Sequence, residues 1–209
     1  MAKLEDGTGT GRRARVTAEN RLSVDSVVFS AEENAIRRGE GWQIASAVPG
    51  VGHIEFQAAQ QTAMLYFSNE DPLDLILDRL VVVLGTPAGG TGDWQLQALR
   101  NPEIGTISEL AGASNSNHGS SKDFPGVALR SLGPVTGGGV AGTDFDTLTG
   151  GTGAVLPIQQ SSNRTVLPLG RRLPTGSTFG VRLTPPAGTT SARALVVAHV
   201  YLDFDTSAS

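Results

Sequence analysis

The residues of this 209-residue chain best suited to proton transfer near neutral pH are its three histidines, His53, His118 and His199. They are scattered along the sequence, and none lies in a His-Glu-x-x-His metal motif or beside a Gly-x-Ser-x-Gly nucleophile motif. His199 falls between Val197 and Tyr201 in a period-two pattern, which favours a hydrogen-bonded or interface histidine. We therefore predict a noncatalytic protein. An enzyme would require His53 or His199 beside two carboxylates in a cleft.

Two further motifs could bind an ion or a nucleotide, but each lacks its usual context. Asp-Phe-Asp-Thr occurs at 144–147 and again at 203–206, without the additional oxygen ligands of a dedicated calcium loop. Gly137, Gly139 and Gly142 match the spacing of a dinucleotide fingerprint, but no strand–helix unit surrounds them. The chain contains no cysteine, so thiolate metal sites are excluded. We predict no metal and no cofactor.

The few aromatic residues leave two interpretations open. Trp42, Trp94, Tyr66 and Tyr201 could form a platform for stacking on a sugar. In a chain with only 5% aromatic residues, we expect them to pack in the core or at an interface instead.

The composition indicates a globular, β-rich protein. Glycine occurs 27 times and charged residues make up 17%, while short apolar runs alternate with Gly, Pro, Ser and Thr. The net charge of −4 predicts no binding to a specific nucleic acid. The aliphatic run at 80–84 is too short to cross a membrane. Residues 1–7 lack the apolar stretch of a secretory signal, so we expect synthesis in a cytoplasm.

Period-two alternation predicts an all-β fold with one short helix. Ser30-Ala31-Glu32-Glu33 matches a capping box and predicts one or two helical turns, with strand and turn as the alternative. Residues 75–84 read as a strand buried on both faces and kinked at Asp78-Arg79. The predicted strands are 22–29, 42–47, 53–58, 62–68, 75–84, 94–100, 127–132, 155–160, 165–169, 178–184 and 194–204.

The last two of these strands show the clearest strand pattern in the sequence. Residues 178–184 have one polar face, 194–204 are apolar on both faces, and 185–190 provide a polar turn. We predict that they form a closing β-hairpin. The second apolar face, which carries His199 and Tyr201, must then pack against the other sheet or another subunit. We predict His199 and Tyr201 as partner-binding residues.

The chain is predicted to form one domain preceded by an arm. Residues 1–20 are read as an extended N-terminal arm, and 21–209 as a single jelly-roll-like β-sandwich of about 8–11 strands. Arg12, Arg13 and Arg15 in the arm are predicted to contact a partner, although a disordered tail without a role is the alternative.

The polar loop 113–121 and the glycine-rich loop 137–153 are long enough to contact a receptor or a glycan.

Both ends of the chain resemble a known group of proteins. Asp6-Gly7-Thr8-Gly9-Thr10-Gly11 followed by Asn20-Arg21-Leu22-Ser23-Val24 is similar to the start of small β-rich virion proteins of tailed bacteriophages. The segment Leu173-Pro174-Thr175-Gly176-Ser177 and the long strand ending Tyr201-Leu202-Asp203-Phe204-Asp205 resemble the same group. That group includes head decoration or cement proteins, head spikes and tail components.

The resemblance implies a noncatalytic virion structural protein that forms a homo-oligomer, with a trimer as one form. We expect a capsid-associated decoration protein whose arm binds the major capsid protein. The alternative is a tail or head–tail connection component bound to tail or portal proteins. A carbohydrate-recognition sandwich is a second alternative. We expect the protein to be located in the virion.

Overall fold

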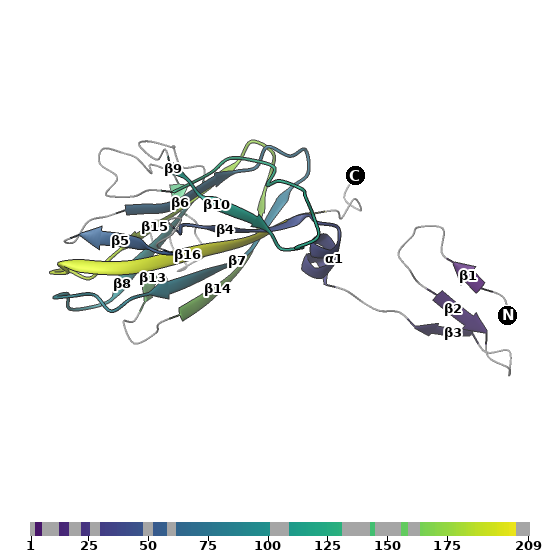
Figure 1. The fold of residues 1–209 in the computed structure, drawn as a ribbon, viewed down its shortest axis with the longest axis horizontal. Coiled ribbons are helices and arrows are strands. Elements are labelled where there is room, and N and C mark those ends of the chain that lie inside the picture. Colours follow the sequence, from purple (N-terminus) through teal and green to yellow (C-terminus); the bar gives the residue numbers. More distant parts are fainter. Residues whose placement is uncertain are drawn as a thin grey trace.

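The computed structural model describes residues 3–5, 13–16, 22–25, 30–47, 52–57, 62–100, 109–130, 143–144, 156–158 and 164–203. Strands dominate these residues, with one short helix. Two antiparallel sheets pack against each other and enclose the core, which confirms the predicted all-β sandwich (Figure 1). They contain more strands than the eight to eleven that we predicted, because several short strands lie in polar segments.

One sheet has six strands. They are β4 (Gly41–Ala45), β5 (Ile54–Gln57), β7 (Leu75–Leu84), β10 (Gly112–Asn115), β14 (Arg164–Leu173) and β16 (Ser191–Leu202). Their order is β10-β4-β16-β7-β14, and β5 also pairs with β16. The long strand β16 is therefore central, as its two apolar faces predicted.

The other sheet has seven strands. They are β6 (Thr62–Ser68), β8 (Trp94–Arg100), β9 (Glu109–Leu110), β11 (Ala128–Arg130), β12 (Thr143–Asp144), β13 (Leu156–Ile158) and β15 (Thr178–Thr184). Their order is β12-β8-β15-β6-β11-β9, and β13 also pairs with β8.

The core is formed by alternate residues of both sheets. From β16 it takes Ala194, Val196 and Val200, while β15 contributes Phe179 and Val181. This is the period of two that a sheet with one buried face requires. The packing continues around the aromatic rings of the seven-stranded sheet, where the Phe67 and Phe179 centroids are 5.2 Å apart.

The tryptophans belong to this core. Trp42 and Trp94 are 2% and 0% exposed, and Tyr66 is buried as well. The interpretation of these three aromatic residues as packing residues is therefore confirmed, and they form no sugar-binding platform on the surface.

The predicted closing hairpin is wrong. Strand β15 pairs with β6 and β8, whereas β16 pairs with β4, β5 and β7. The chain crosses from one sheet to the other between them. Pro185 and Pro186, both buried, open this crossing and have no backbone N–H to donate to a ladder. Alternation in the sequence could not distinguish the two arrangements, because strands that face each other across a core show the same period as paired strands.

The predicted kink in β7 is confirmed as a β-bulge at Asp78. Leu77 pairs with Val200 and Arg79 pairs with His199, so Asp78 is an additional residue on β7. A bulge places two consecutive side chains opposite one partner residue. Here it brings Asp78 and Arg79 together on the face of the sheet that points away from the core.

Strand β14 is longer than the predicted 165–169, and among the described strands it pairs only with β7. Its interior contains Pro168, which lacks an N–H, and Gly170, which has a φ of 56°. The register shifts between Pro168 and Arg171. Proline and a bulge are features by which natural edge strands resist pairing with other chains.

The prediction of a loop at 113–121 is wrong for its first residues. Gly112–Asn115 forms edge strand β10, paired with β4. Its residues are polar or small and mostly exposed, so they show no hydrophobic alternation from which a strand could be predicted. Of the loop predicted at 137–153, only the two residues of β12 lie among those that the structure describes.

The N-terminal strands β1 (Lys3–Glu5), β2 (Arg13–Val16) and β3 (Leu22–Asp25) form a third, three-stranded antiparallel sheet. Figure 1 shows it beyond the helix and apart from the sandwich. The segment that we read as an arm thus contains strands, and residues 22–25, which we assigned to the sandwich, pair with β2.

Candidate interaction surface

The outer face of the six-stranded sheet carries a row of valines. Val166 of β14, Val81 of β7 and Val197 of β16 are direct cross-strand neighbours, and Ala45 of β4 follows. Val166 is 47% exposed, while Val81 between its neighbours is 7% exposed. We call Val81, Val166 and Val197 the valine strip. The face of β16 that we predicted to need a partner is therefore not covered by the second sheet.

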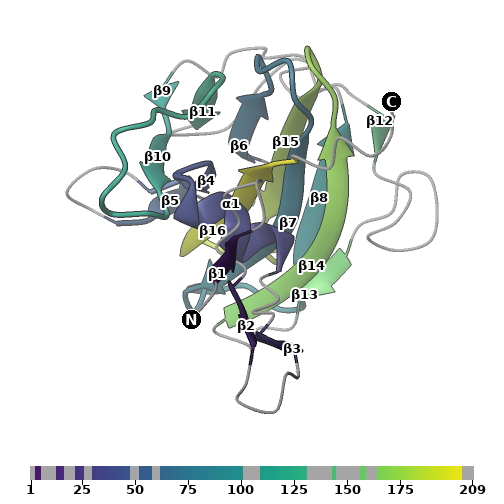
Figure 2. The same ribbon diagram turned by 90° about the vertical axis from the view of Figure 1, so that its right-hand side faces the viewer.

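The single described helix, α1 (Ala31–Arg37), lies against β16 and β4 (Figure 2). Its predicted capping box is confirmed at the N-cap, because the Glu33 N–H donates to Ser30 Oγ at 3.1 Å. A Cβ on Gly41 would lie 2.9 Å from Ile36 Cγ1. Glycine at the start of β4 therefore lets the helix approach the sheet closely.

An ion-pair cluster joins the helix to the sheet next to the valine strip. Arg79 Nη1 donates to Glu32 Oε2 at 3.0 Å, and Arg79 Nη2 lies 3.0 Å from Glu32 Oε1. Such a two-pronged contact is the geometry that favours arginine over lysine. Arg79 also contacts the Asp78 carboxylate, and its Nη2 lies 3.3 Å from His199 Nδ1. We call Glu32, Asp78, Arg79 and His199 the Arg79 cluster.

The cluster changes the proton affinity of its members. The hydrogen bond with Glu32 raises the pKa of the Arg79 guanidinium. Burial, together with the positive charge of Arg79, lowers the pKa of His199 below its ordinary value. Burial also raises the pKa of Tyr201, and the nearby Asp78 and Asp203 carboxylates add to this. At neutral pH His199 is therefore an uncharged hydrogen-bond acceptor within a charged network.

The structure brings together only part of the predicted partner-binding set. His199 and Tyr201 lie on the outer face of the six-stranded sheet, opposite Gln43 and Gly41 of β4. Arg13 and Arg15 lie in β2 of the separate N-terminal sheet, and Arg12 lies outside the described residues.

Sequence reasoning missed Glu32, Asp78 and Arg79 as members of this surface. The signals were present, because Glu32 is part of the capping box and Asp78-Arg79 is the charged pair at the kink. The strand register that places Arg79 opposite His199 could not be predicted from the sequence.

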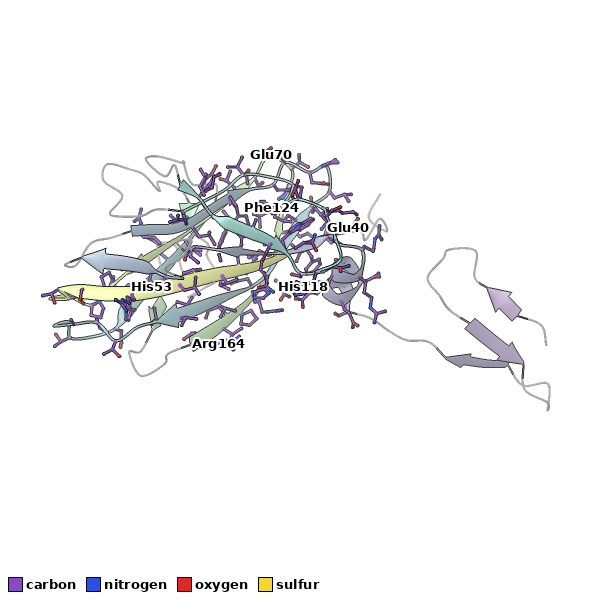
Figure 3. All side chains as sticks on the ribbon, in the orientation of Figure 1. Glu40, His53, Glu70, His118, Phe124 and Arg164 are labelled. Atoms are coloured by element: carbon purple, nitrogen blue, oxygen red, sulfur yellow. The ribbon has the colours of Figure 1, made fainter. Side chains whose placement is uncertain are left out.

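His199 does not lie directly against two carboxylates. The Arg79 guanidinium binds both Glu32 and Asp78, and it also contacts His199. His53 and His118 lie well apart from each other on the molecule (Figure 3). Asp203, from the second Asp-Phe-Asp-Thr, pairs with Arg172 Nη2 at 2.6 Å. Within the described residues, no three or more His, Asp or Glu side chains are grouped to hold a metal ion.

A cavity of about 370 Å³ lies elsewhere, at the helix end of the sandwich. Its lining includes Glu40, Trp42 and Lys122. Glu40 is paired with Lys122 Nζ at 2.6 Å and with Arg38 Nε at 3.0 Å. Both oxygens of this carboxylate thus face a cation.

The end of β10 and the polar loop that follows it are tied to the helix and to the turn after the helix. Asn115 Nδ2 donates to the Gly39 carbonyl at 2.7 Å, and Asn117 Nδ2 donates to the Arg37 carbonyl at 3.2 Å. The first bond satisfies a carbonyl in the turn that follows α1, and the second satisfies a carbonyl at the helix C-terminus, where the last carbonyls have no partner within the helix. This part of the loop predicted to contact a receptor or glycan therefore has a structural role.

A comparison with protein-family models finds no match, and comparisons with curated proteins and with solved structures find no significant similarity. Among the residues that the structure describes, no helix is both long and apolar enough to cross a membrane.

Proposed function

We propose that this protein is a noncatalytic structural component of a tailed-phage virion, a capsid-associated decoration protein that oligomerises. Its N-terminal segment attaches it to the head shell. The resemblance of both chain ends to phage virion proteins motivates this proposal. The architecture supports it, because a rigid sandwich with a separate N-terminal sheet suits attachment rather than catalysis.

We also infer that the sandwich is a jelly roll. Eight strands of the two sheets form this pattern. Numbered from one to eight in chain order, they are β4, β6, β7, β8, β13, β14, β15 and β16. In one sheet the order is β4-β16-β7-β14, which are the first, eighth, third and sixth of these strands. In the other sheet the order is β6-β15-β8-β13, which are the second, seventh, fourth and fifth of these strands. This is the order that two interlocked Greek keys produce.

The observation that carries the attachment is the division of the N-terminal sheet into two unlike faces. The register places Ala14 opposite both Leu4 and Val24, and Val16 opposite Leu22. Residues directly opposite in a sheet share a face, so one face of the N-terminal sheet is entirely apolar.

The other face of this sheet is polar throughout. Arg13 lies opposite both Glu5 and Asp25, and Arg15 lies opposite Lys3 and Ser23. The opposite charges around Arg13 stabilise a sheet in water, whereas Arg15 and Lys3 repel each other, and a face that is polar throughout suits contact with solvent. We therefore place Arg13 and Arg15 on the solvent side of the attachment, where they help to shape the sheet.

A sheet of three strands is at the lower limit for independent stability, so covering its apolar face would stabilise it. Covering a Val or Leu side chain fully contributes about 1.5–3 kcal/mol. The apolar face of the N-terminal sheet can therefore supply several kcal/mol toward binding, and its matching partner is an apolar surface on a shell protein.

The experiment compares two substitutions at adjacent positions of β3 that lie on opposite faces. Val24→Glu places a charge on the apolar face, and Ser23→Glu places the same charge on the polar face. Purified variants are mixed with particles lacking the protein, and the bound fraction is measured by sedimentation. We expect Val24→Glu to reduce binding by more than about tenfold, which corresponds to about 1.4 kcal/mol. Ser23→Glu should bind like the native protein.

Equal binding of both variants would overturn the attachment through this face. Loss of binding in both would also overturn it, provided that circular dichroism shows both sandwiches folded. Labelling the protein on intact virions distinguishes a decoration protein from the alternative, a tail or head–tail connection component, because each reading requires label at a different end of the particle.

A further inference from the structure

We propose that the valine strip is the docking site of the chain's own N-terminal sheet in the protein before it attaches. In this docked state the apolar face of the N-terminal sheet covers the strip. Figure 1 shows the two apart, which corresponds to the released state. Docking itself requires no partner, whereas its competition with the shell rests on the proposed attachment.

The apolar rows of the two surfaces match in length. The valine strip is a row of directly opposite residues across three adjacent strands, β14, β7 and β16. On the N-terminal sheet, Leu4, Ala14 and Val24 are also a row across three adjacent strands. Neighbouring strands are about 4.8 Å apart in any sheet, and stacked sheets pack about 10 Å apart. One row can therefore lie along the other over its whole length, as in the packing of two sheets in a sandwich.

Charged residues border the strip on both sides. The neighbouring row on one side contains Arg164, and the neighbouring row on the other side contains Arg79. An apolar centre with a polar rim is the usual arrangement of a contact surface. The charges of the N-terminal sheet lie on its opposite face, so docking leaves Arg13 and Arg15 on the solvent side.

Docking removes both apolar faces from water in one step. Val166 is 47% exposed, although Val81 directly opposite is buried. A sheet of three strands is at the lower limit for independent stability and gains from a cover over its apolar face. Because the gain from burial is roughly proportional to the apolar area removed from water, one contact stabilises both surfaces.

The connection to the sandwich keeps the N-terminal sheet beside the strip. Glu32 of α1 binds Arg79 of β7, and Val81 of the strip follows two positions later, about 7 Å along the strand. Asp25 is the last residue of β3, and Ser30 is the N-cap of α1. The five peptide steps between these two residues span at most about 18 Å. This reach is enough to bring β3 over the strip while α1 stays in place.

The short connection also favours the chain's own sheet over the sheet of a second copy. A tether of this length confines the N-terminal sheet to an effective concentration that is roughly millimolar at the strip. A second copy reaches that concentration only when the protein itself is millimolar. In micromolar solution the strip is therefore occupied from within the chain.

Docking uses the same apolar face that we propose for attachment to the shell. One face cannot lie on two surfaces at once, so the strip and the shell compete for it. The apparent affinity for the shell is reduced to the fraction of chains that are in the released state. A substitution that weakens docking from the side of the strip should therefore strengthen attachment.

The chain has no cysteine, so two introduced cysteines can carry spin labels at defined positions. Ser23→Cys lies on the polar face of β3. Ser114→Cys is exposed on β10 and lies on the same face of the six-stranded sheet as the strip. The distance distribution between the labels is measured in the isolated chain at micromolar concentration. We expect a short, narrow population from the docked state.

Three valine variants in this labelled chain test the cause. Val166→Glu places a charge in the strip and should lower the ratio of docked to released chains by more than about tenfold. Val166→Ser is milder and should lower the ratio in the same direction. Val127→Glu is the matched control, because Val127 is 40% exposed but precedes β11 of the other sheet, and it should keep the native distribution. Circular dichroism verifies that each sandwich is folded.

A native chain without the short population would overturn the docking, as would an unchanged distribution in both Val166 variants. The labelled chain is also diluted with an excess of unlabelled chain. Docking within one chain keeps the short population, whereas its loss on dilution would show docking between copies and overturn the proposal.

Particles that lack the protein separate this inference from the proposed attachment. Added in excess, they should remove the short population. Val166→Glu should bind them more tightly than the native chain, by the factor by which the released fraction increases. A short population without binding to particles would support the docking and overturn the attachment. Binding to particles without a short population in the free chain would overturn the docking alone.

Discussion

Asn69 should be among the most sensitive polar positions in the molecule. It is fully buried, and its side-chain Nδ2 donates to the Leu173 carbonyl at 2.8 Å and to the Leu73 carbonyl at 2.9 Å. Its Oδ1 accepts from the Asp71 N–H at 3.0 Å. One amide group therefore joins the turn after β6 to the end of β14, far away in the sequence.

Asn69→Ala removes all three bonds and leaves two carbonyls and one N–H without this partner. A buried polar group without a partner costs about 1–3 kcal/mol, and solvent can reach the less buried of these groups. We therefore expect Asn69→Ala to lower the free energy of unfolding by about 3–5 kcal/mol.

Asn69→Asp should be worse at neutral pH, although it preserves the shape. It keeps the acceptor for Asp71 but replaces the donating Nδ2 by an oxygen that faces the Leu73 and Leu173 carbonyls. Burial and these carbonyls should raise the pKa of the introduced carboxyl in the folded state. The folded state then binds more protons than the unfolded state, so the variant should regain stability as the pH falls toward about 4 and lose it as the pH rises.

Urea unfolding followed by tryptophan fluorescence measures these changes, because Trp42 and Trp94 are both buried. The midpoint should fall by more than about 1 M for Asn69→Ala with an unchanged slope. Asn34→Asp, at an exposed position on the helix, is the matched control and should unfold like the native chain. If Asn69→Asp were as stable as the native chain, or more stable than Asn69→Ala at neutral pH, the argument from the Nδ2 donors would be refuted.

Two further comparisons test packing on β7 and at a glycine. Val82→Thr places a hydroxyl at a fully buried core position and should cost about 1–3 kcal/mol, whereas Val83→Thr on the outer face should be nearly neutral in the same urea experiment. A Cβ on Gly126 would lie 2.1 Å from the Ser68 carbonyl oxygen, so Gly126→Ala should cost about 1–3 kcal/mol, measured by thermal unfolding. Gly112→Ala has open space around its Cβ and should leave the melting temperature unchanged; a large decrease there would contradict this steric reasoning.

Local alternation was sufficient to predict most of the individual strands. Strands β6, β7 and β8 have the predicted bounds, because apolar residues mark their inward positions and turn residues mark their ends. The kink at Asp78-Arg79 and the helix start at Ser30 were also predicted from local chemistry. Each of these features depends on residues close together in the sequence, which is why the sequence was informative.

Pairing between distant strands could not be predicted in the same way. Strands β15 and β16 lie in different sheets, and nothing in their alternation distinguishes a paired strand from one across the core. The Arg79 cluster could not be predicted for the same reason. Glu32, Arg79 and His199 meet only through the register of β7 and β16 and the docking of α1. The polar strand β10 was missed because its stability comes from the ladder with β4.

The form of the long edge strand β14 limits the kinds of assembly that this protein can build. With Pro168 and the Gly170 bulge in its interior, β14 cannot template an uninterrupted ladder on a neighbouring chain. Addition of copies along this edge, which would have no natural end point, is thereby disfavoured. The homo-oligomer that we propose would instead use sheet faces, whose contacts can close on themselves. A protein built in this way can be present at high local concentration on a surface and still stop at a defined number of copies.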